Sequence, residues 1–333
     1  MMTMANLSTK YLGMTLKSPV VVGACSLSKR VDTIREIEAA GAGALVIKSL
    51  FQEQIELEAQ AFEDALNTGA DHFAESLRYF PTQALKYSGA QEHLMWVREA
   101  RKAVQMPLIA SLSATDKDKW VEYAKQLQDT GVNALELNAY SVEADPDTLS
   151  SDIEHRLFDT VCAITSNIKI PVAVKLAPFY TSVASVCKAL AEAGADGITL
   201  FNRFYQPDID VEHECLRITM DYSSPAETRL PLRWIALLSG DLDVDFAAST
   251  GIHTVEDVAR HLLAGAAVTQ IVSALYVNSV QHVAALNRGL SDWMDRKGYA
   301  TVGDFRGKVS RRRIDDPHAF ERAQYIKLLL GHD

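Results

Sequence analysis

One short pattern recurs four times in this sequence and constrains the fold more than any other feature. In each copy a glycine closes a helical stretch, small residues follow, and a β-rich strand runs on to a polar residue. The copies span residues 41–48, 131–138, 194–202 and 265–273. Glycine just past a helix accepts the left-handed conformation that ends it. A strand between two helices is half of a β-α-β unit, so the repeats predict a parallel sheet.

Eight predicted strands alternate with helices along the chain. We expect the strands at residues 18–25, 44–47, 107–111, 134–138, 171–178, 197–201, 246–249 and 268–272. We expect the helices at residues 31–40, 92–104, 120–128, 153–165, 183–193, 231–238, 255–263 and 280–294. No change in composition divides the chain. The pattern therefore favours the α/β class, as a single (β/α)8 TIM barrel over residues 1–333, rather than a doubly wound sheet.

Two connections are longer than a plain barrel requires. Residues 51–90, after the second strand, are acidic at first and then aromatic, and residues 203–229, after the sixth, are rich in charged and aromatic side chains. Loops of this length in a compact fold usually carry function. We therefore expect a barrel with inserted loops after strands two and six.

Composition excludes several classes of partner. A net charge of −10 argues against nucleic acid and anionic membranes, because either needs a basic face. No stretch approaches the ~20 apolar residues of a membrane span, and residues 1–8 lack the charged-then-apolar order of a secretory signal. The four cysteines form no Cys-x-x-Cys pair, which argues against a metal site. We expect a cytoplasmic protein that acts on a small molecule.

Polar residues gather where the predicted strands end, and barrels of this class build their active sites at those ends. Lys48 and Lys175 end the second and fifth strands, and Asn138 and Asn202 end the fourth and sixth. An unpaired lysine is costly in a core, so the two lysines together indicate a site for an anion or a polar ring. Ser111 ends the third strand, and we expect it to face the substrate.

The last two strands are followed by residues typical of a phosphate site. Thr250 and Gly251 follow the seventh strand, and Val272 and Ser273 follow the eighth. Phosphate sites in these barrels commonly use backbone N–H groups of the loops after strands seven and eight, together with a helix N-terminus. We therefore expect a phosphate group to bind there.

A series of short motifs runs in order along nearly the whole chain, at residues 16–24, 46–49, 136–138, 174–178, 251–258, 262–266, 270–275, 297–299 and 304–308. This ordered set resembles the dihydroorotate dehydrogenase family of FMN-dependent (β/α)8 barrels, and in particular its divergent members. The resemblance implies FMN as the cofactor. Ala24 and Cys25 would lie by the flavin ring, and Lys48 and Ser49 would contact the ring and the ribityl chain. Asn138 would contact both ring and substrate.

The resemblance also assigns the two ends of the cofactor. Lys175 would sit near the edge of the flavin that accepts electrons, where a fixed cation stabilises the anionic reduced flavin. Thr250-Gly251 and Val272-Ser273 would give backbone N–H groups to the FMN phosphate. Lys48 and Lys175 therefore count among the expected catalytic residues.

The family's catalytic base is a Cys or Ser in an Asn-x-x-Cys/Ser pattern after the fourth strand. Here Asn138-Ala-Tyr-Ser141 puts Ser141 in that position. A base on one face of the substrate, with N5 of the flavin on the other, would remove a proton and a hydride from adjacent carbons. Serine has a very high intrinsic pKa and needs a relay, for which Tyr140, Glu143 and a water all stay open.

Among the residues expected to bind the substrate, the sequence matches the family pattern at some positions and departs from it at others. Asn202 matches a substrate-side asparagine, and Arg203 and Arg78 are candidates for bidentate binding of a carboxylate. The Pro-Asn pair that follows the base in the family is Val142-Glu143 here. We therefore expect dihydroorotate or a related dihydropyrimidine-like carboxylated substrate.

Three functions compete at this point. The leading one is an FMN-dependent oxidoreductase acting on a CH–CH bond. The second is a phosphate-binding barrel lyase or aldolase in which Lys175 or Lys48 forms a Schiff base. The third is a non-catalytic flavoprotein subunit of a redox complex. The family resemblance also implies a homodimer.

Overall fold

The computed structural model describes residues 5–52, 90–113, 116–217, 221–320 and 330. Eight parallel strands close into a barrel in the order β11-β12-β3-β4-β5-β6-β7-β8. Their bounds are β3 (Val20–Val22), β4 (Leu45–Phe51), β5 (Leu108–Ser113), β6 (Ala134–Ala139), β7 (Val172–Leu176), β8 (Gly197–Leu200), β11 (Asp245–Ser249) and β12 (Val268–Ile271). The predicted (β/α)8 barrel is confirmed, and each predicted strand overlaps an observed one.

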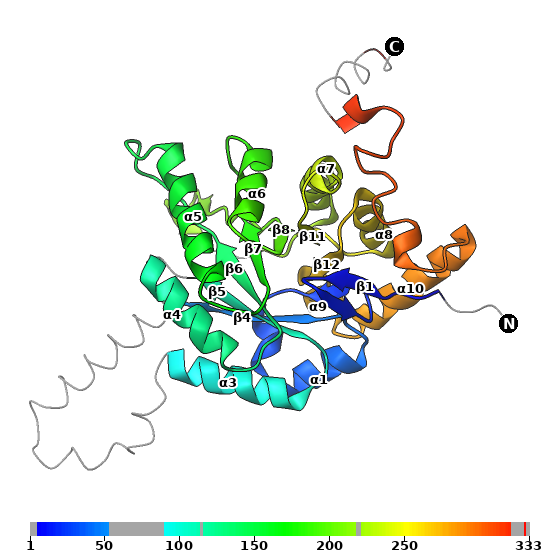
Figure 1. The fold of residues 1–333 in the computed structure, drawn as a ribbon, viewed down its shortest axis with the longest axis horizontal. Coiled ribbons are helices and arrows are strands. Elements are labelled where there is room, and N and C mark those ends of the chain that lie inside the picture. The colour runs from blue at the N-terminus through cyan, green and yellow to red at the C-terminus, as the bar shows by residue number, and fades with distance from the viewer. Residues whose placement is uncertain (1–4, 53–89, 114–115, 218–220, 321–329, 331–333) are drawn as a thin grey trace, which may run out of the picture.

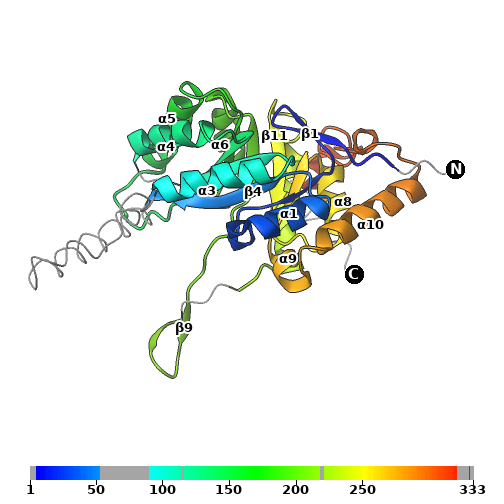
Figure 2. The ribbon, with the colours of Figure 1, turned by 90° about the horizontal axis from the view of Figure 1, so that it is seen from below.

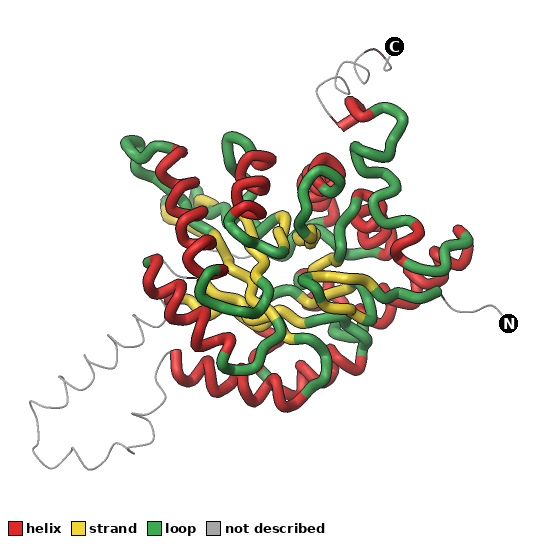
Figure 3. Tube along the Cα trace, viewed as in Figure 1, coloured by secondary structure: helices red, strands yellow, loops and turns green. Residues whose placement is uncertain are grey.

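Helices surround the barrel (Figures 1 and 3). They are α1 (Val31–Ala39), α3 (Ala90–Ala103), α4 (Lys117–Gln128), α5 (Ser150–Thr165), α6 (Val183–Glu192), α7 (Arg229–Leu238), α8 (Val255–Ala264), α9 (Ser273–Asn278) and α10 (His282–Lys297). Local sequence sets their ends. The Asp116 carboxylate caps α4 by accepting from two backbone N–H groups, and Gly265, at φ 118°, ends α8 in the left-handed conformation.

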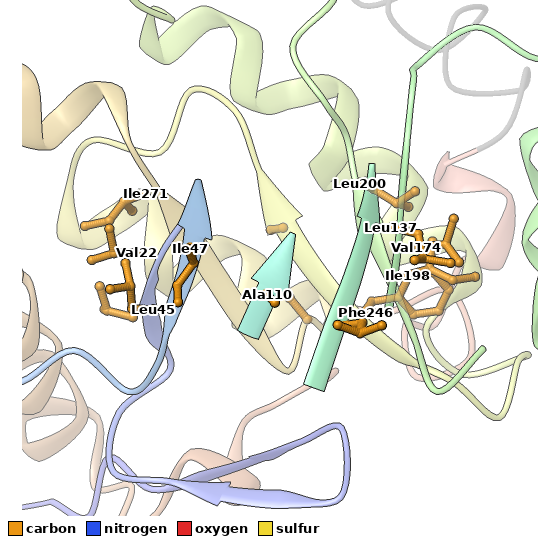
Figure 4. Close-up of a cluster of buried hydrophobic side chains, with 14 of the residues drawn as sticks. Val22, Leu45, Ile47, Ala110, Leu137, Val174, Ile198, Leu200, Phe246 and Ile271 are labelled. Atoms are coloured by element: carbon orange, nitrogen blue, oxygen red, sulfur yellow. The ribbon is translucent and has the colours of Figure 1, made fainter. Parts of the chain in front are cut away.

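The side chains of each barrel strand alternate between two buried clusters. Val22, Leu45 and Ile47 point outward, into the layer between strands and helices (Figure 4). Val21 and Val46 point inward, into a separate cluster inside the barrel. Successive strand residues face opposite sides of a sheet, so one run of apolar residues fills both layers. This explains why the predicted strands read as continuous apolar stretches.

An N-terminal hairpin, which the sequence analysis did not predict, closes one end of the barrel. It consists of β1 (Thr9–Tyr11) and β2 (Met14–Leu16) and lies over the centre of the barrel in Figure 1. Tyr11 is 0% exposed and packs into the inner cluster with Leu12. The Leu12 N–H donates to the Asp245 carboxylate at 2.9 Å, which ties the hairpin to the start of β11. The opposite end, where the strands terminate, is left for the site.

The predicted insertion after the sixth strand contains a second hairpin. Its strands are β9 (Asp208–Asp210) and β10 (Cys215–Arg217), which pair antiparallel. Figure 2 shows β9 projecting from the barrel on the side opposite the β1–β2 hairpin. An inserted loop after the sixth strand was predicted, but the short β9–β10 pairing within it was not. The insertion after the second strand lies almost wholly outside the described residues, and so does Arg78.

Other differences are small. β4 continues to Phe51 rather than ending at Lys48, because a register shift between Ile47 and Leu50 lets the strand run on beside β5. The last helix, α10, begins two residues later than predicted and follows the short helix α9.

None of the helices within the described ranges has the length and apolar character that crossing a membrane requires.

Replacing Tyr11 tests the closing role of the hairpin. Tyr11→Ala should lower the free energy of unfolding by about 3–5 kcal/mol, since it opens a cavity among fully buried side chains. Tyr11→Phe keeps the ring and should change it by no more than about 1 kcal/mol. Lys10→Ala, at the exposed neighbouring position, is the control. Urea denaturation measures all three, and a small loss for Tyr11→Ala would contradict the assignment.

Candidate active site

The carboxyl ends of the strands bring several predicted site residues together. The register shift in β4 brings Ser49 towards the barrel interior, where its Oγ lies 2.7 Å from Ser111 Oγ. Both serines are buried, and Ser111 lies the deeper of the two. Lys48 is half-buried, and its backbone N–H donates to Ser28 Oγ at 2.9 Å. Ser111 therefore contacts Ser49 and supports it from below.

Asn138, Lys175 and Asn202 form the centre of the mouth. Asn138 on β6 stands directly beside Lys175 on β7 in the strand register. Asn202, which follows β8, donates from Nδ2 to Asn138 Oδ1 at 2.7 Å. Lys175 is 9% exposed, and its Nζ lies 3.9 Å from the Glu136 carboxylate beneath it. Three adjacent strand ends thus present two amides and an ammonium in one place.

Two titratable side chains around the site are neutral at pH 7. Burial, together with the charge of Lys48, lowers the pKa of His93 to about 4, so its imidazole carries no charge. Cys25, after β3, is half-buried. Burial raises the pKa of the Cys25 thiol, although hydrogen bonds and the charge of Lys175 partly oppose the shift. Cys25 is therefore a neutral thiol beside the site, and the half-buried Ala24 precedes it.

The predicted phosphate residues also come together. Thr250 and Gly251 follow β11 with φ of 80° and 75°, and the Thr250 hydroxyl donates to the Phe201 carbonyl at 3.0 Å. The Gly251 N–H donates to Ser223 Oγ at 3.3 Å. Ser223 in turn donates from its hydroxyl and from its N–H to Ser273 Oγ, at 2.9 and 3.0 Å. Ser223 thereby joins the loop after β11 to Ser273, just beyond Val272 and the end of β12.

Gly251 leaves no room for a side chain. A Cβ at this position would lie 2.5 Å from the Thr228 backbone nitrogen and 2.8 Å from the Ser224 carbonyl oxygen. Its positive φ also disfavours other residues. Glycine is thus required here by the close approach of the backbone of residues 224–228.

Sequence reasoning missed Ser223, although a pattern beside it was available. Ser224 and Glu227 form a capping box at the start of the 3-10 helix η4 (Pro225–Thr228). Ser-x-x-Glu before an apolar run is a recognised helix start. Reading that pattern would have placed the end of the insertion against the mouth.

Arg203 occupies a more constrained position than expected. Its Nε donates to Glu227 Oε1 at 3.0 Å. Burial raises the pKa of Glu227, but hydrogen bonds from Ser224 and Arg203 outweigh this and hold it below its ordinary value. Glu227 is therefore an anion that fixes the guanidinium through one nitrogen. Within the described residues, no hydrogen bond involves the two terminal nitrogens of Arg203.

Ser141 follows the end of β6 and is exposed. No hydrogen bond to its hydroxyl occurs within the described part of the chain. Glu143 instead pairs with Arg156 at 3.1 Å, and the Tyr140 hydroxyl accepts from the Tyr205 N–H at 3.3 Å. Of the three relay candidates for Ser141, the two side chains therefore have other partners.

The donor set fits FMN. On one side of the mouth, the hydroxyls of Ser223 and Ser273 and the backbone of Gly251 lie together, joined by hydrogen bonds. Such groups suit a phosphate dianion. The other side presents Lys175 and the amide of Asn138, which suit a polar ring that gains negative charge.

Comparison with known proteins agrees with this geometry. The dihydroorotate dehydrogenase family profile matches residues 6–294. The dihydroorotate dehydrogenase B (NAD(+)) catalytic subunit of Thermoplasma acidophilum is 27% identical, over 92% of this chain and 100% of the relative. Its namesake from Alkaliphilus metalliredigens is 24% identical over the same shares. Dihydroorotate dehydrogenase A (fumarate) of Limosilactobacillus reuteri is 26% identical, over 81% of this chain and 87% of the relative.

These findings confirm three of the predictions made from sequence. Enzymes of this family are FMN-dependent oxidoreductases that act on a CH–CH bond, and they share the TIM barrel. The oxidoreductase prediction is therefore confirmed, and the lyase alternative is set aside. On a match that extends from residue 6 to residue 294, the chain belongs to the dihydroorotate dehydrogenase family.

Proposed function

We propose that this protein oxidises dihydroorotate, or a related dihydropyrimidine-like carboxylated ring, to the corresponding unsaturated ring. The observation that carries the proposal is the Asn138–Asn202 amide pair beside Lys175. Carboxamides offer both donors and acceptors, as the cyclic amide groups of a dihydropyrimidine do. The names of the relatives, which are dihydroorotate dehydrogenases, support the same substrate class.

FMN, when bound, supplies the hydride acceptor, and the protein supplies position and charge. Lys175 holds a positive charge at the mouth, where it stabilises negative charge that develops during the reaction. Lys48 and Ser49 would contact the flavin ring and the ribityl chain. Gly251 and Ser273, joined by Ser223, would hold the phosphate of the cofactor.

The proton leaves towards Ser141. Its exposed position after β6 suits a base, and a water serves as the relay because Glu143 and Tyr140 are engaged elsewhere. Arg203 binds the substrate carboxylate through its two terminal nitrogens while Glu227 holds Nε. Ordering Arg203 in advance reduces the entropy lost when the substrate binds.

The same proposal includes one domain over residues 1–333, a homodimer and a cytoplasmic location. The unbroken composition supports the single domain, family resemblance supports the dimer, and the net charge of −10 with spread cysteines supports the compartment. Light scattering after size exclusion tests the dimer.

The direct test is the visible spectrum of the purified protein. We expect a yellow protein whose released cofactor has the mass of FMN, and whose absorbance bleaches when dihydroorotate is added without oxygen. A yellow protein that does not bleach would overturn dihydroorotate as substrate and leave a flavoprotein that serves a redox partner. A protein that cannot be loaded with FMN would overturn the proposal entirely.

Ser141 can be tested by two substitutions. Ser141→Ala should slow anaerobic reduction by the substrate about 10²–10⁴-fold, the usual contribution of a general base. Ser141→Cys should retain activity and lower the pH of half-maximal rate, because a free thiol ionises near pH ~8.5 and a hydroxyl far above it. Stopped-flow absorbance at several pH values measures both. Equal rates for Ser141→Ala and the parent would exclude this base.

Gly251 can be tested with a matched glycine. Gly251→Ala should weaken FMN binding by about tenfold or more, because the Cβ meets backbone atoms of residues 224–228. Gly298→Ala is the control, since Gly298 has the same φ of 75° but no atom within 4 Å of an added Cβ. Backbone strain alone would affect both variants, whereas the clash with residues 224–228 affects only Gly251→Ala. Fluorescence titration of the cofactor-free proteins with FMN measures the difference.

A further inference from the structure

A carboxylate lies inside the barrel, one layer beneath the mouth. Glu136 is in the middle of β6, two residues before Asn138, and is 0% exposed. Residues two apart on a strand share a face, so Glu136 lies directly below Asn138. A buried carboxylate is costly unless it is paired and hydrogen-bonded. The groups that pair with the Glu136 carboxylate therefore indicate its role.

Only one of the two oxygens of Glu136 is hydrogen-bonded. Oε2 accepts from the Thr199 hydroxyl at 3.0 Å and from Gln270 Nε2 at 2.5 Å. These partners stand on β8 and β12, so the network crosses the barrel. Oε1 has no hydrogen bond within the described structure, and Lys175 Nζ lies 3.9 Å from it. Among the described residues, Lys175 is the one cation within ion-pair distance of Glu136.

Among the residues that the structure describes, the layer beneath Glu136 places no cation within ion-pair distance of its carboxylate. Tyr11 closes the barrel below it. Burial raises the pKa of Tyr11, and the nearby charge of Glu136 raises it further, so Tyr11 stays a neutral phenol. The negative charge of Glu136 is therefore balanced from above, on the side of the mouth, by Lys175.

We propose that Glu136 is a positioning residue that anchors the Lys175 ammonium at the mouth before any negative charge develops there. The inference rests on the proposed function, because it concerns the charge offered to the cofactor. An oxidised flavin ring is uncharged, so it gives a nearly buried ammonium no counter-ion. A fixed carboxylate does, and Thr199 and Gln270 hold this one in place.

The first test needs no cofactor. In Glu136→Gln, which keeps the shape of the side chain, the Lys175 amine loses its counter-ion and its anchor, and it becomes more available to a reagent. Labelling of Lys175 by acetic anhydride, quantified by mass spectrometry, should be about tenfold faster than in the parent protein. Glu136→Met, of similar length, repeats the test should the amide not fold.

The second test uses sulfite, which adds to oxidised flavin to give an anionic adduct and bleaches it. Sulfite should bind FMN-loaded Glu136→Gln about tenfold more weakly than the parent, because the Lys175 ammonium is no longer anchored where the negative charge of the adduct develops. In a Lys175→Met background, Glu136→Gln should cause no further weakening. A double-mutant cycle of this kind isolates an effect that acts through Lys175.

Asp245→Asn is the matched control. Asp245 is a carboxylate at the other end of the barrel, where it accepts from Leu12 and pairs with Arg306. Replacing the Asp245 carboxylate by an amide should lower the melting temperature of the protein. It should leave the labelling rate of Lys175 and the affinity for sulfite unchanged. A change that occurs in Glu136→Gln but not in Asp245→Asn is therefore an effect on Lys175 and not a result of general destabilisation.

Two results would overturn the inference. One is unchanged labelling of Lys175 in Glu136→Gln. The other is weakening of sulfite binding that persists without Lys175. If the parent protein bound no FMN, the proposed function would fail, and the labelling comparison would still decide the role of Glu136.

Discussion

The rest of the structure depends on closing a sheet into a ring. Once the ring is closed, the side chains that point inward must fill a space of fixed width. A closed sheet has no edge strand that could shift to accommodate side chains of the wrong size. This chain fills the lower part with small and branched apolar residues and with Tyr11 from the N-terminal hairpin. In the layer above, Glu136, Thr199 and Gln270 replace apolar side chains. The interior therefore changes from apolar to polar along the barrel axis.

This gradient explains how a cation can stand at the mouth. Lys175 is nearly buried, and water alone cannot offset the cost of its charge. The polar layer supplies an opposite charge from inside the barrel, and hydrogen bonds from two other strands hold that charge in place. The upper face of the ammonium is then left for the ligand. The β1–β2 hairpin and the site at the opposite end are thus parts of one continuous packing arrangement.

Much of the fold could be predicted from sequence, because glycine followed by a β-rich run marks the entry to four of the eight barrel strands. The site was predicted where a polar residue ends a strand, as at Asn138 and Lys175. Contacts that depend on the path of a loop were missed: Ser223 reaches Gly251 and Ser273 only once the insertion folds back. The β1–β2 hairpin was missed because three-residue strands carry almost no periodicity. Glu136 lay within a recognised motif, but sequence alone does not show what lies beneath Lys175.

The closed lower end has a kinetic consequence. Since Tyr11 and Leu12 fill that end, molecules that exchange with the cofactor do so through the mouth between the strand ends. Under the proposed function, a substrate and a diffusible electron acceptor would share that one entrance. The product would have to leave before the acceptor could enter, so the substrate would react with the oxidised enzyme and the acceptor with the reduced enzyme. Ping-pong kinetics is the expected consequence.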